Sequence, residues 1–192
     1  NKYYTLDEYK TLIESNQTDK DKNLIYIYAT DHIAQYNYIE MAQAKGYDVL
    51  LMDGQLDIHF IGLLEQKLEK SRFVRVDSDI VENLVKKEDK SATVLTSEER
   101  EMMTTVFKSQ IPAIEKADFL VMFEPIGENA QPVIITQNEF MRRMKDMSAM
   151  QPGMNFYGEL PDSFNLIVNT EHPLSKKIIE DTENACKTEI EP

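Results

Sequence analysis

Apolar and polar positions alternate in blocks along the first half of the chain, and each block has the length of one secondary-structure element. Short apolar runs rich in β-branched and aromatic residues predict buried strands at 24–29, 48–52 and 73–76. Amphipathic stretches predict helices at 5–14, 31–45 and 56–70. Because strands and helices alternate, we predict an α/β fold whose first unit is a small parallel-sheet αβα unit ending near Val85.

Capping signals support two of these helices. The segment Thr5-Leu6-Asp7-Glu8 matches a capping box, in which a threonine hydroxyl and a glutamate three residues later satisfy free backbone amides at the helix start. Asp31 can cap the second helix, and Gly46 follows its last turn as a C-terminal glycine cap. We therefore expect the second helix to begin directly after Asp31.

A charged stretch of low hydrophobicity divides the chain, so we predict a domain at 1–85, a linker at 86–97 and a second domain at 98–192. Helical and strand patterns in the second domain predict an α+β unit. Its expected elements are a helix to Gln110, strands at 119–123, 133–136 and 164–168, a helix at 138–150 and a final helix from Pro173.

The helix expected at 138–150 is rich in methionine. Five of the ten methionines fall within fourteen residues, at Met141, Met144, Met147, Met150 and Met154. The first four recur at every third position, which on a helix produces one slowly drifting apolar stripe. The pattern alone favours packed core for such a stripe, whereas a binding surface is the alternative, because flexible thioethers accept many apolar partners.

The net charge of the chain argues against a nucleic-acid partner. The 192 residues have a formal net charge of -13, which repels a nucleic-acid backbone, and 42% of them are hydrophobic, as is typical of a globular protein. The only local basic cluster is Arg142, Arg143 and Lys145, which we interpret as a solvated helix face. We expect no DNA or RNA partner.

Cysteine usage and hydropathy indicate a cytoplasmic protein without a membrane partner. The single Cys186 cannot form an internal disulfide, and no apolar run approaches the roughly 20 residues needed to cross a bilayer. The chain begins without methionine, and its first residues do not resemble a signal peptide. We expect it to be an excised piece of a longer protein.

Catalytic and metal-binding patterns are missing from the sequence. The six glycines form no phosphate-binding frame, the three histidines lack metal-ligand spacing, and Cys186 has no base near it in sequence. We therefore expect no catalytic, cofactor or metal site. A small α/β ligand-binding or enzyme domain is the alternative, with Asp31 and Asp53 at strand ends as candidate residues. Their structural interpretation is a helix cap and a turn aspartate next to Gly54.

Several segments, in this order and spacing, closely resemble the heat shock protein 90 family of molecular chaperones in its bacterial form. Three of them resemble the end of that family's middle domain: Tyr4 to Tyr9, Ile25 to Thr30 and Lys45 to Met52. The others resemble its C-terminal domain: Pro132 to Thr136 followed by Met141 and Met144, and Asn165 to Leu174, which contains an Asn-x-x-His-Pro pattern before a helix. The resemblance spans nearly the whole chain.

This resemblance implies that the parent protein is a homodimeric, ATP-driven chaperone that binds partly folded client proteins in a cleft between two arms. In that family ATP and magnesium bind in an N-terminal domain, an arginine of the early middle domain assists hydrolysis, and the last C-terminal helices pair two subunits. None of these three parts matches this chain. We therefore expect the chain to lack ATP binding and ATPase activity and to end before the dimerisation helices.

Client contact is the family property that the resemblance places here. The family's methionine-bearing helix corresponds to Phe140, Met141, Met144, Met147 and Met150, so the resemblance favours an exposed stripe. A second family contact, on a middle-domain helix, corresponds to His59 and Phe60. There the sequence departs from the family, because His59 and Gly62 replace aromatic and polar residues of some relatives.

Overall fold

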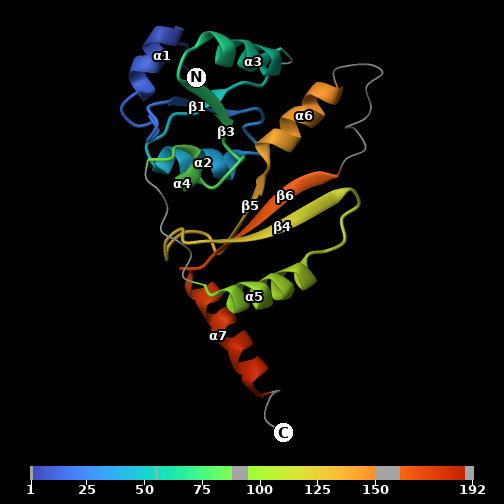
Figure 1. Ribbon diagram of the computed structural model, residues 1–192. Coiled ribbons are helices and arrows are strands. Elements are labelled where there is room, and N and C mark those ends of the chain that lie inside the picture. The colour runs from blue at the N-terminus through green and yellow to red at the C-terminus, as the bar shows by residue number, and fades with distance from the viewer. Residues whose placement is uncertain (1, 55, 88–94, 150–160, 189–192) are drawn as a thin grey trace. The chain divides into compact units, whose positions relative to one another are not determined.

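Two compact units, Asn1–Lys90 and Ser91–Pro192, make up the chain, and each has its own strands and helices (Figure 1). The computed structural model describes the backbone of residues 2–54, 56–87, 95–149 and 161–188. The side chains of Ile58, of residues 145–149 and of residues 186–188 lie outside that description.

A three-stranded parallel sheet forms the centre of the first unit, with the strand order β2-β1-β3. Its strands are β1 (Leu24–Ala29), β2 (Leu50–Leu51) and β3 (Ser71–Arg75). Its helices are α1 (Leu6–Ile13), α2 (Tyr36–Ala44), α3 (Asp57–Lys67) and α4 (Val81–Leu84). The predicted α/β class is confirmed, since parallel strands alternate with helices along this unit.

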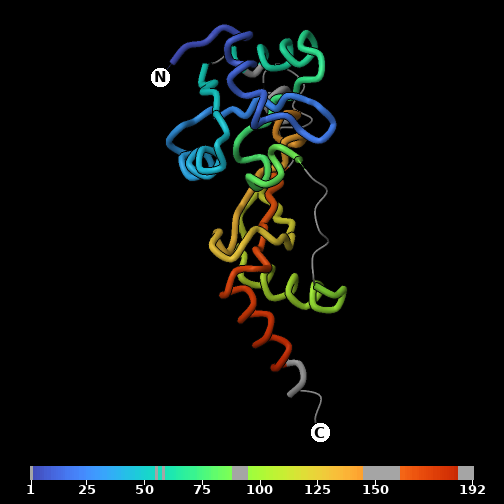
Figure 2. The backbone as a smooth tube through the Cα atoms, turned by 90° about the vertical axis from the view of Figure 1, so that its left-hand side faces the viewer, coloured from blue at the N-terminus to red at the C-terminus, as the bar shows by residue number. Residues whose placement is uncertain are grey.

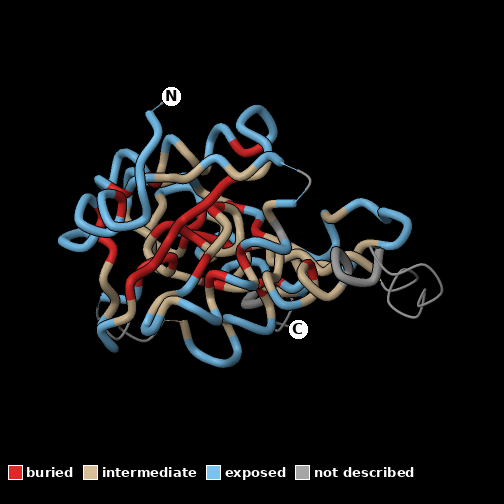
Figure 3. The backbone as a smooth tube through the Cα atoms, turned by 90° about the horizontal axis from the view of Figure 1, so that it is seen from above, coloured by how far each residue is buried: buried red, intermediate tan, exposed pale blue. Residues whose placement is uncertain are grey.

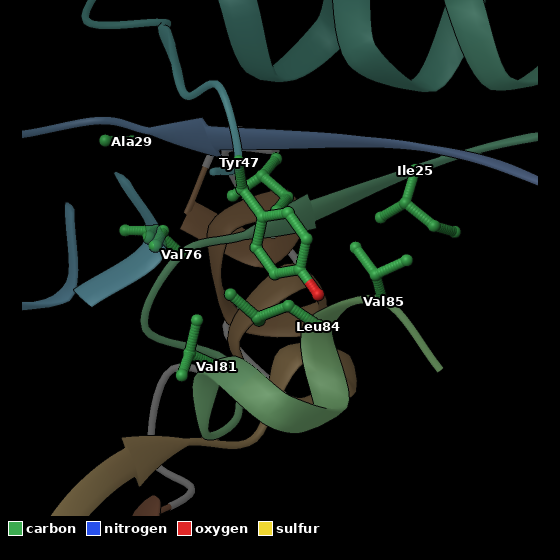
Figure 4. Packing of buried hydrophobic residues seen from close by; sticks show 9 residues of the cluster. Ile25, Ala29, Tyr47, Val76, Val81, Leu84 and Val85 are labelled. Carbon is green, nitrogen blue, oxygen red and sulfur yellow. The ribbon is translucent and has the colours of Figure 1, made fainter. Parts of the chain in front are cut away.

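All six residues of β1 are buried, because helices cover both faces of the sheet. Side chains at 24, 26 and 28 join α1, α3 and Phe73 in one cluster. Side chains at 25, 27 and 29 join α2, α4 and Tyr47 in the other. Figure 3 marks these buried positions in red, and Figure 4 shows the Tyr47 ring lying among Val76, Val81 and Leu84. The unit is therefore a three-layer αβα sandwich.

Local hydrogen bonds confirm one predicted helix start and contradict another. The Thr5 and Glu8 capping box is present, with the Glu8 amide 3.3 Å from the Thr5 hydroxyl. Asp31, in contrast, accepts hydrogen bonds from the amides of Ile33 and Ala34, and α2 begins only at Tyr36. The expectation that the second helix begins directly after Asp31 is therefore wrong, because the aspartate closes a turn that precedes the helix.

The second unit contains a mixed sheet with the strand order β4-β6-β5, in which β6 is parallel to β4 and antiparallel to β5. Its strands are β4 (Ala117–Glu124), β5 (Val133–Gln137) and β6 (Asp162–Asn169). Its helices are α5 (Ser97–Gln110), α6 (Glu139–Ala149) and α7 (Pro173–Thr188).

Helix α5 covers one face of this sheet, and α7 packs against α5 and runs away from the sheet (Figures 1 and 2). Their core cluster includes Met103 of α5, Val121 and Phe123 of β4, and Val168 of β6. Helix α6 packs against β6 and lies on the side of the sheet away from α5 (Figure 1). The methionine-rich helix is therefore held by strand β6 and lies apart from the main core of its unit.

The Asn-x-x-His-Pro pattern closes the end of β6. Asn169 is fully buried, and its Oδ1 accepts hydrogen bonds from the amides of Ile126 and Glu171, both at 3.1 Å. Its Nδ2 donates to the carbonyl oxygens of Gly127 and Gln131. One asparagine side chain thus joins the β4–β5 loop to the turn that leads into α7.

The next residues of the same pattern start α7. The Nδ1 atom of His172 accepts a hydrogen bond from the Leu174 amide at 3.1 Å, so the imidazole satisfies a free amide at the helix start. Pro173 is the first residue of the helix, where its missing amide proton costs nothing.

Within the described part of the chain, no helix combines the length and apolarity needed to cross a membrane.

Candidate functional site

Strand β6 and Asn138 fix the beginning of α6. The Asn138 amide donates to the Ser163 carbonyl oxygen of β6 at 3.3 Å. Its side-chain Oδ1 accepts from the Met141 amide at 3.2 Å, and its carbonyl oxygen accepts from the Arg142 amide at 3.1 Å. Asn138 therefore caps the helix and attaches its first turn to the sheet.

A partly buried ionic cluster occupies the first turns of α6. The Glu139 carboxylate accepts a hydrogen bond from Arg142 Nη2 at 2.8 Å and another from Arg143 Nε at 2.7 Å. Burial alone would raise the pKa of this carboxyl, but the two guanidinium groups outweigh burial and hold the pKa below its ordinary value. The carboxylate thus remains charged at neutral pH.

The side chain of Arg142 is only 6% exposed, and that of Arg143 is partly buried. Our interpretation of Arg142, Arg143 and Lys145 as a solvated helix face is therefore wrong for Arg142. Arg142 can be buried because the neighbouring Glu139 carboxylate compensates its charge. The side chain of Lys145 lies outside the described residues.

Apolar side chains of α6 lie on a different side of the helix from Arg142. Phe140 is 69% exposed, and Met141 and Met144 are partly buried. Helical spacing places Phe140 and Met144 one above the other and Arg142 roughly opposite them. The side chain of Met147, and Met150 and Met154 entirely, lie outside the described residues.

Helix α3 of the first unit also has an exposed apolar side. His59 is exposed and Phe60 is 47% exposed, as are their neighbours Leu56 at 76% and Leu63 at 44%. Positions 56, 60 and 63 share one helix face, whereas Ile61 and Leu64 face the core. Leu56 and Leu63 were not predicted as contact residues, although their helical spacing from Phe60 indicates the same face.

No protein-family model matches the chain. It is 58% identical over 191 residues to the chaperone protein htpG of Bacteroides fragilis strain YCH46, and 56% identical over 192 residues to the chaperone protein HtpG of Bacteroides thetaiotaomicron. The chaperone protein HtpG of Porphyromonas gingivalis strain ATCC 33277 is 51% identical over 189 residues. These matches cover 98 to 100% of this chain but only 27 to 28% of the relatives' length.

The chain belongs to the HtpG family of chaperones. The predicted resemblance to bacterial heat shock protein 90 is therefore confirmed, and it applies to the whole chain. The chain spans little more than a quarter of the curated HtpG relatives that it matches.

The candidate contacts of this HtpG-family chain lie on two helices in two different units. Phe140, Met141 and Met144 belong to α6, and His59 and Phe60 belong to α3. Both helices combine a packed side with exposed aromatic or aliphatic side chains, which is the arrangement that an apolar partner requires.

The candidate residues of a ligand-binding α/β domain have ordinary structural surroundings. Asp31 Oδ1 is 2.9 Å from the Ile33 amide and 3.0 Å from the Ala34 amide, and these two hydrogen bonds lower the pKa of its carboxyl. Asp53 is exposed. Among the residues that the structure describes, no group of three or more His, Cys, Asp or Glu side chains is arranged to hold a metal ion. Asp31 therefore closes a turn before α2 and does not cap the helix itself, whose N-cap is Gln35.

Proposed function

We propose that this HtpG-family chain binds partly folded client proteins through the apolar side of α6, with α3 as a second contact. The exposure of Phe140, at 69%, on a helix whose Arg142 is 6% exposed is the observation that carries this proposal. A helix on the surface of a monomeric protein ordinarily buries its aromatic side chains and exposes its arginines. The reversed arrangement in α6 supports a surface that another polypeptide covers.

The contacts available on α6 fit weak and reversible binding. Fully burying one methionine or phenylalanine side chain contributes about 1.5 to 3 kcal/mol, and shallow contacts contribute less. Phe140, Met141 and Met144 can therefore hold an apolar client segment without binding it permanently. Unbranched methionine side chains adapt to clients of different shape.

The function of the whole protein is part of the same proposal. We infer that this region links the ATP-hydrolysing arms of a homodimeric cytoplasmic chaperone to its dimerisation region. The sequence has no glycine-rich phosphate loop, and the described residues contain no carboxylate cluster suited to magnesium. These observations support placing the ATP and magnesium sites outside this chain.

Replacing Met141, Met144 and Met147 together by serine tests the proposal. We expect the variant to bind an unfolded client peptide more weakly, as measured by fluorescence anisotropy, because three adaptable apolar contacts are lost. We also expect the melting temperature to change little, because Met141 and Met144 lie outside the core cluster of their unit. A large drop in melting temperature would instead show that the stripe is packed core.

Met103 provides the matched control, because it is a methionine of the same unit with 0% exposure. We expect Met103→Ser to lower the melting temperature strongly while leaving client affinity unchanged under conditions where the variant is folded. Client binding that survives the triple serine change would contradict the proposal for α6. Binding that then disappears on further changing Phe60 to serine would assign it to α3.

A further inference from the structure

Helix α6 buries charge and exposes an aromatic ring, so its orientation on the sheet has to be explained by something other than apolar burial. The apolar side, with Phe140 and Met144, would pack against a sheet more favourably than an arginine would. Arg142 nevertheless occupies a buried position, and Phe140 does not. A specific interaction must therefore stabilise the observed orientation.

Glu139 supplies that interaction. Its carboxylate lies 2.8 Å from Arg142 Nη2 and 2.7 Å from Arg143 Nε, so one acid holds two guanidinium groups in the first turns of the helix. A buried arginine is tolerated only when an opposite charge and hydrogen bonds compensate it. Consecutive helix positions point about 100° apart, so a rotation that exposed Arg142 would carry Phe140 and Met144 toward the protein.

We propose that Glu139 and Arg142 are positioning residues for client binding, and that their partly buried ion pair holds α6 with Phe140 turned outward and with Met141 and Met144 only partly covered. This proposal rests on the proposed function of α6. The Asn138 contacts to Ser163 and to the Met141 amide fix where the helix begins, and the ion pair fixes which side of it faces inward. The lowered pKa of Glu139 supports the pairing, because it keeps the carboxylate charged at neutral pH.

The orientation can be measured without any client. Methionine methyl groups labelled with carbon-13 report solvent access through the relaxation enhancement that a soluble paramagnetic agent causes in nuclear magnetic resonance spectra. Met141 and Met144 report on α6, and the fully buried Met103 is an internal reference for folding of the same unit. We compare the full chain with Glu139→Gln, which keeps the size of the side chain but removes its charge.

We expect Glu139→Gln to shift the Met141 and Met144 methyl signals and to reduce their relaxation enhancement, while the Met103 signal stays in place. Glu139→Asp, which keeps the charge, should retain the enhancement of the unmodified chain. Glu98→Gln is the matched control, because it makes the same chemical change at an exposed position of α5. Unchanged methyl signals in Glu139→Gln would overturn the proposal, as would the same loss in Glu139→Asp.

If Glu139→Gln displaces the Met103 signal and thus unfolds the unit, Arg142→Gln replaces it, because Glu139 then keeps its bond to Arg143. Loss of enhancement in this variant supports the proposal, and unchanged enhancement overturns it. Client affinity separates the two proposals. If the methyl groups become covered in Glu139→Gln but client binding is undiminished, the proposed function of α6 is contradicted and the proposed role of the ion pair is not. If the methyl groups are unchanged but the triple serine variant binds clients more weakly, the role of the ion pair is contradicted and the function is not.

Discussion

At the scale of single residues, Asn169 connects more of the chain than any other side chain described above. It is fully buried and bonds to four backbone groups on two segments. We expect Asn169→Ala to lower the free energy of unfolding by about 1 to 3 kcal/mol for each buried group left without a partner. Urea denaturation measures this loss. Asn129→Ala, at an exposed position of the same loop, is the control, and equal stabilities of the two variants would contradict the prediction.

Tyr9 makes the stability of the first unit sensitive to alkaline pH. Its hydroxyl donates to Asp48 Oδ1 at 2.9 Å, and burial, followed by the Asp48 charge, raises the pKa of the phenol above its ordinary value of 10.0. The folded state therefore favours the neutral phenol. Stability is fully present below about pH 10 and is lost at higher pH, by up to about 1.4 kcal/mol per pH unit, because the unfolded phenol ionises first.

Denaturation as a function of pH tests this sign. We expect Tyr9→Phe to be less stable than the unmodified chain at pH 7, because it lacks the bond to Asp48, and to lose less stability above about pH 10. Other buried tyrosines contribute to the alkaline loss in both proteins, so the difference between the two curves isolates Tyr9. Tyr3→Phe, at a residue that is 96% exposed, should follow the unmodified curve. Parallel curves for Tyr9→Phe would contradict the prediction.

At the scale of elements, β1 is the strand on which the first unit depends. Ile27 at its centre is 0% exposed and belongs to the core cluster that joins α2 and α4. We expect Ile27→Ala to lower the free energy of unfolding by about 2 to 5 kcal/mol, because it leaves a cavity between packed layers. Ile33→Ala, at a residue that is 77% exposed, should change it by about 0.5 kcal/mol or less. Similar losses in both variants would contradict this role of β1.

Elements with strong local patterns were predictable from the sequence. The apolar run at 24–29 is β1, and the capping box at Thr5 begins α1 as expected. Elements that depend on tertiary contacts were not predictable. Helix α4 has four residues, too few for a periodic pattern, and is held by the burial of Val81 and Leu84. The strand expected at 48–52 is reduced to two residues, because only positions 50 and 51 pair with β1.

The position of the candidate site along the chain was predictable from the sequence, whereas the burial of its side chains was not. Methionine spacing and family resemblance located α6, and the structure describes Phe140 as exposed. The buried position of Arg142 could not be read from the pattern, because an arginine beside a second arginine ordinarily faces water. Helix α6 packs against β6 and Glu139 pairs with Arg142, and neither contact is visible in helical periodicity.

At the scale of the whole molecule, the two units have separate core clusters. We therefore expect residues 1–87 and residues 95–192, prepared as separate pieces, each to unfold cooperatively, as measured by circular dichroism during urea titration. Ile27→Ala should destabilise only the first piece, and Met103→Ser only the second. A piece that shows no cooperative transition would contradict this division, and the domain boundaries predicted from the sequence would then need revision.

The strand order has a consequence for folding during synthesis. Strand β1 pairs with the later strand β3, with Leu24 opposite Ser71, and β4 and β5 both pair with β6 rather than with each other. During synthesis, the apolar β1 segment therefore leaves the ribosome before β3 exists, and β4 leaves it before β6 exists. The nascent chain thus passes through a stage at which apolar strands are unpaired, as they are in the partly folded proteins that we propose it binds.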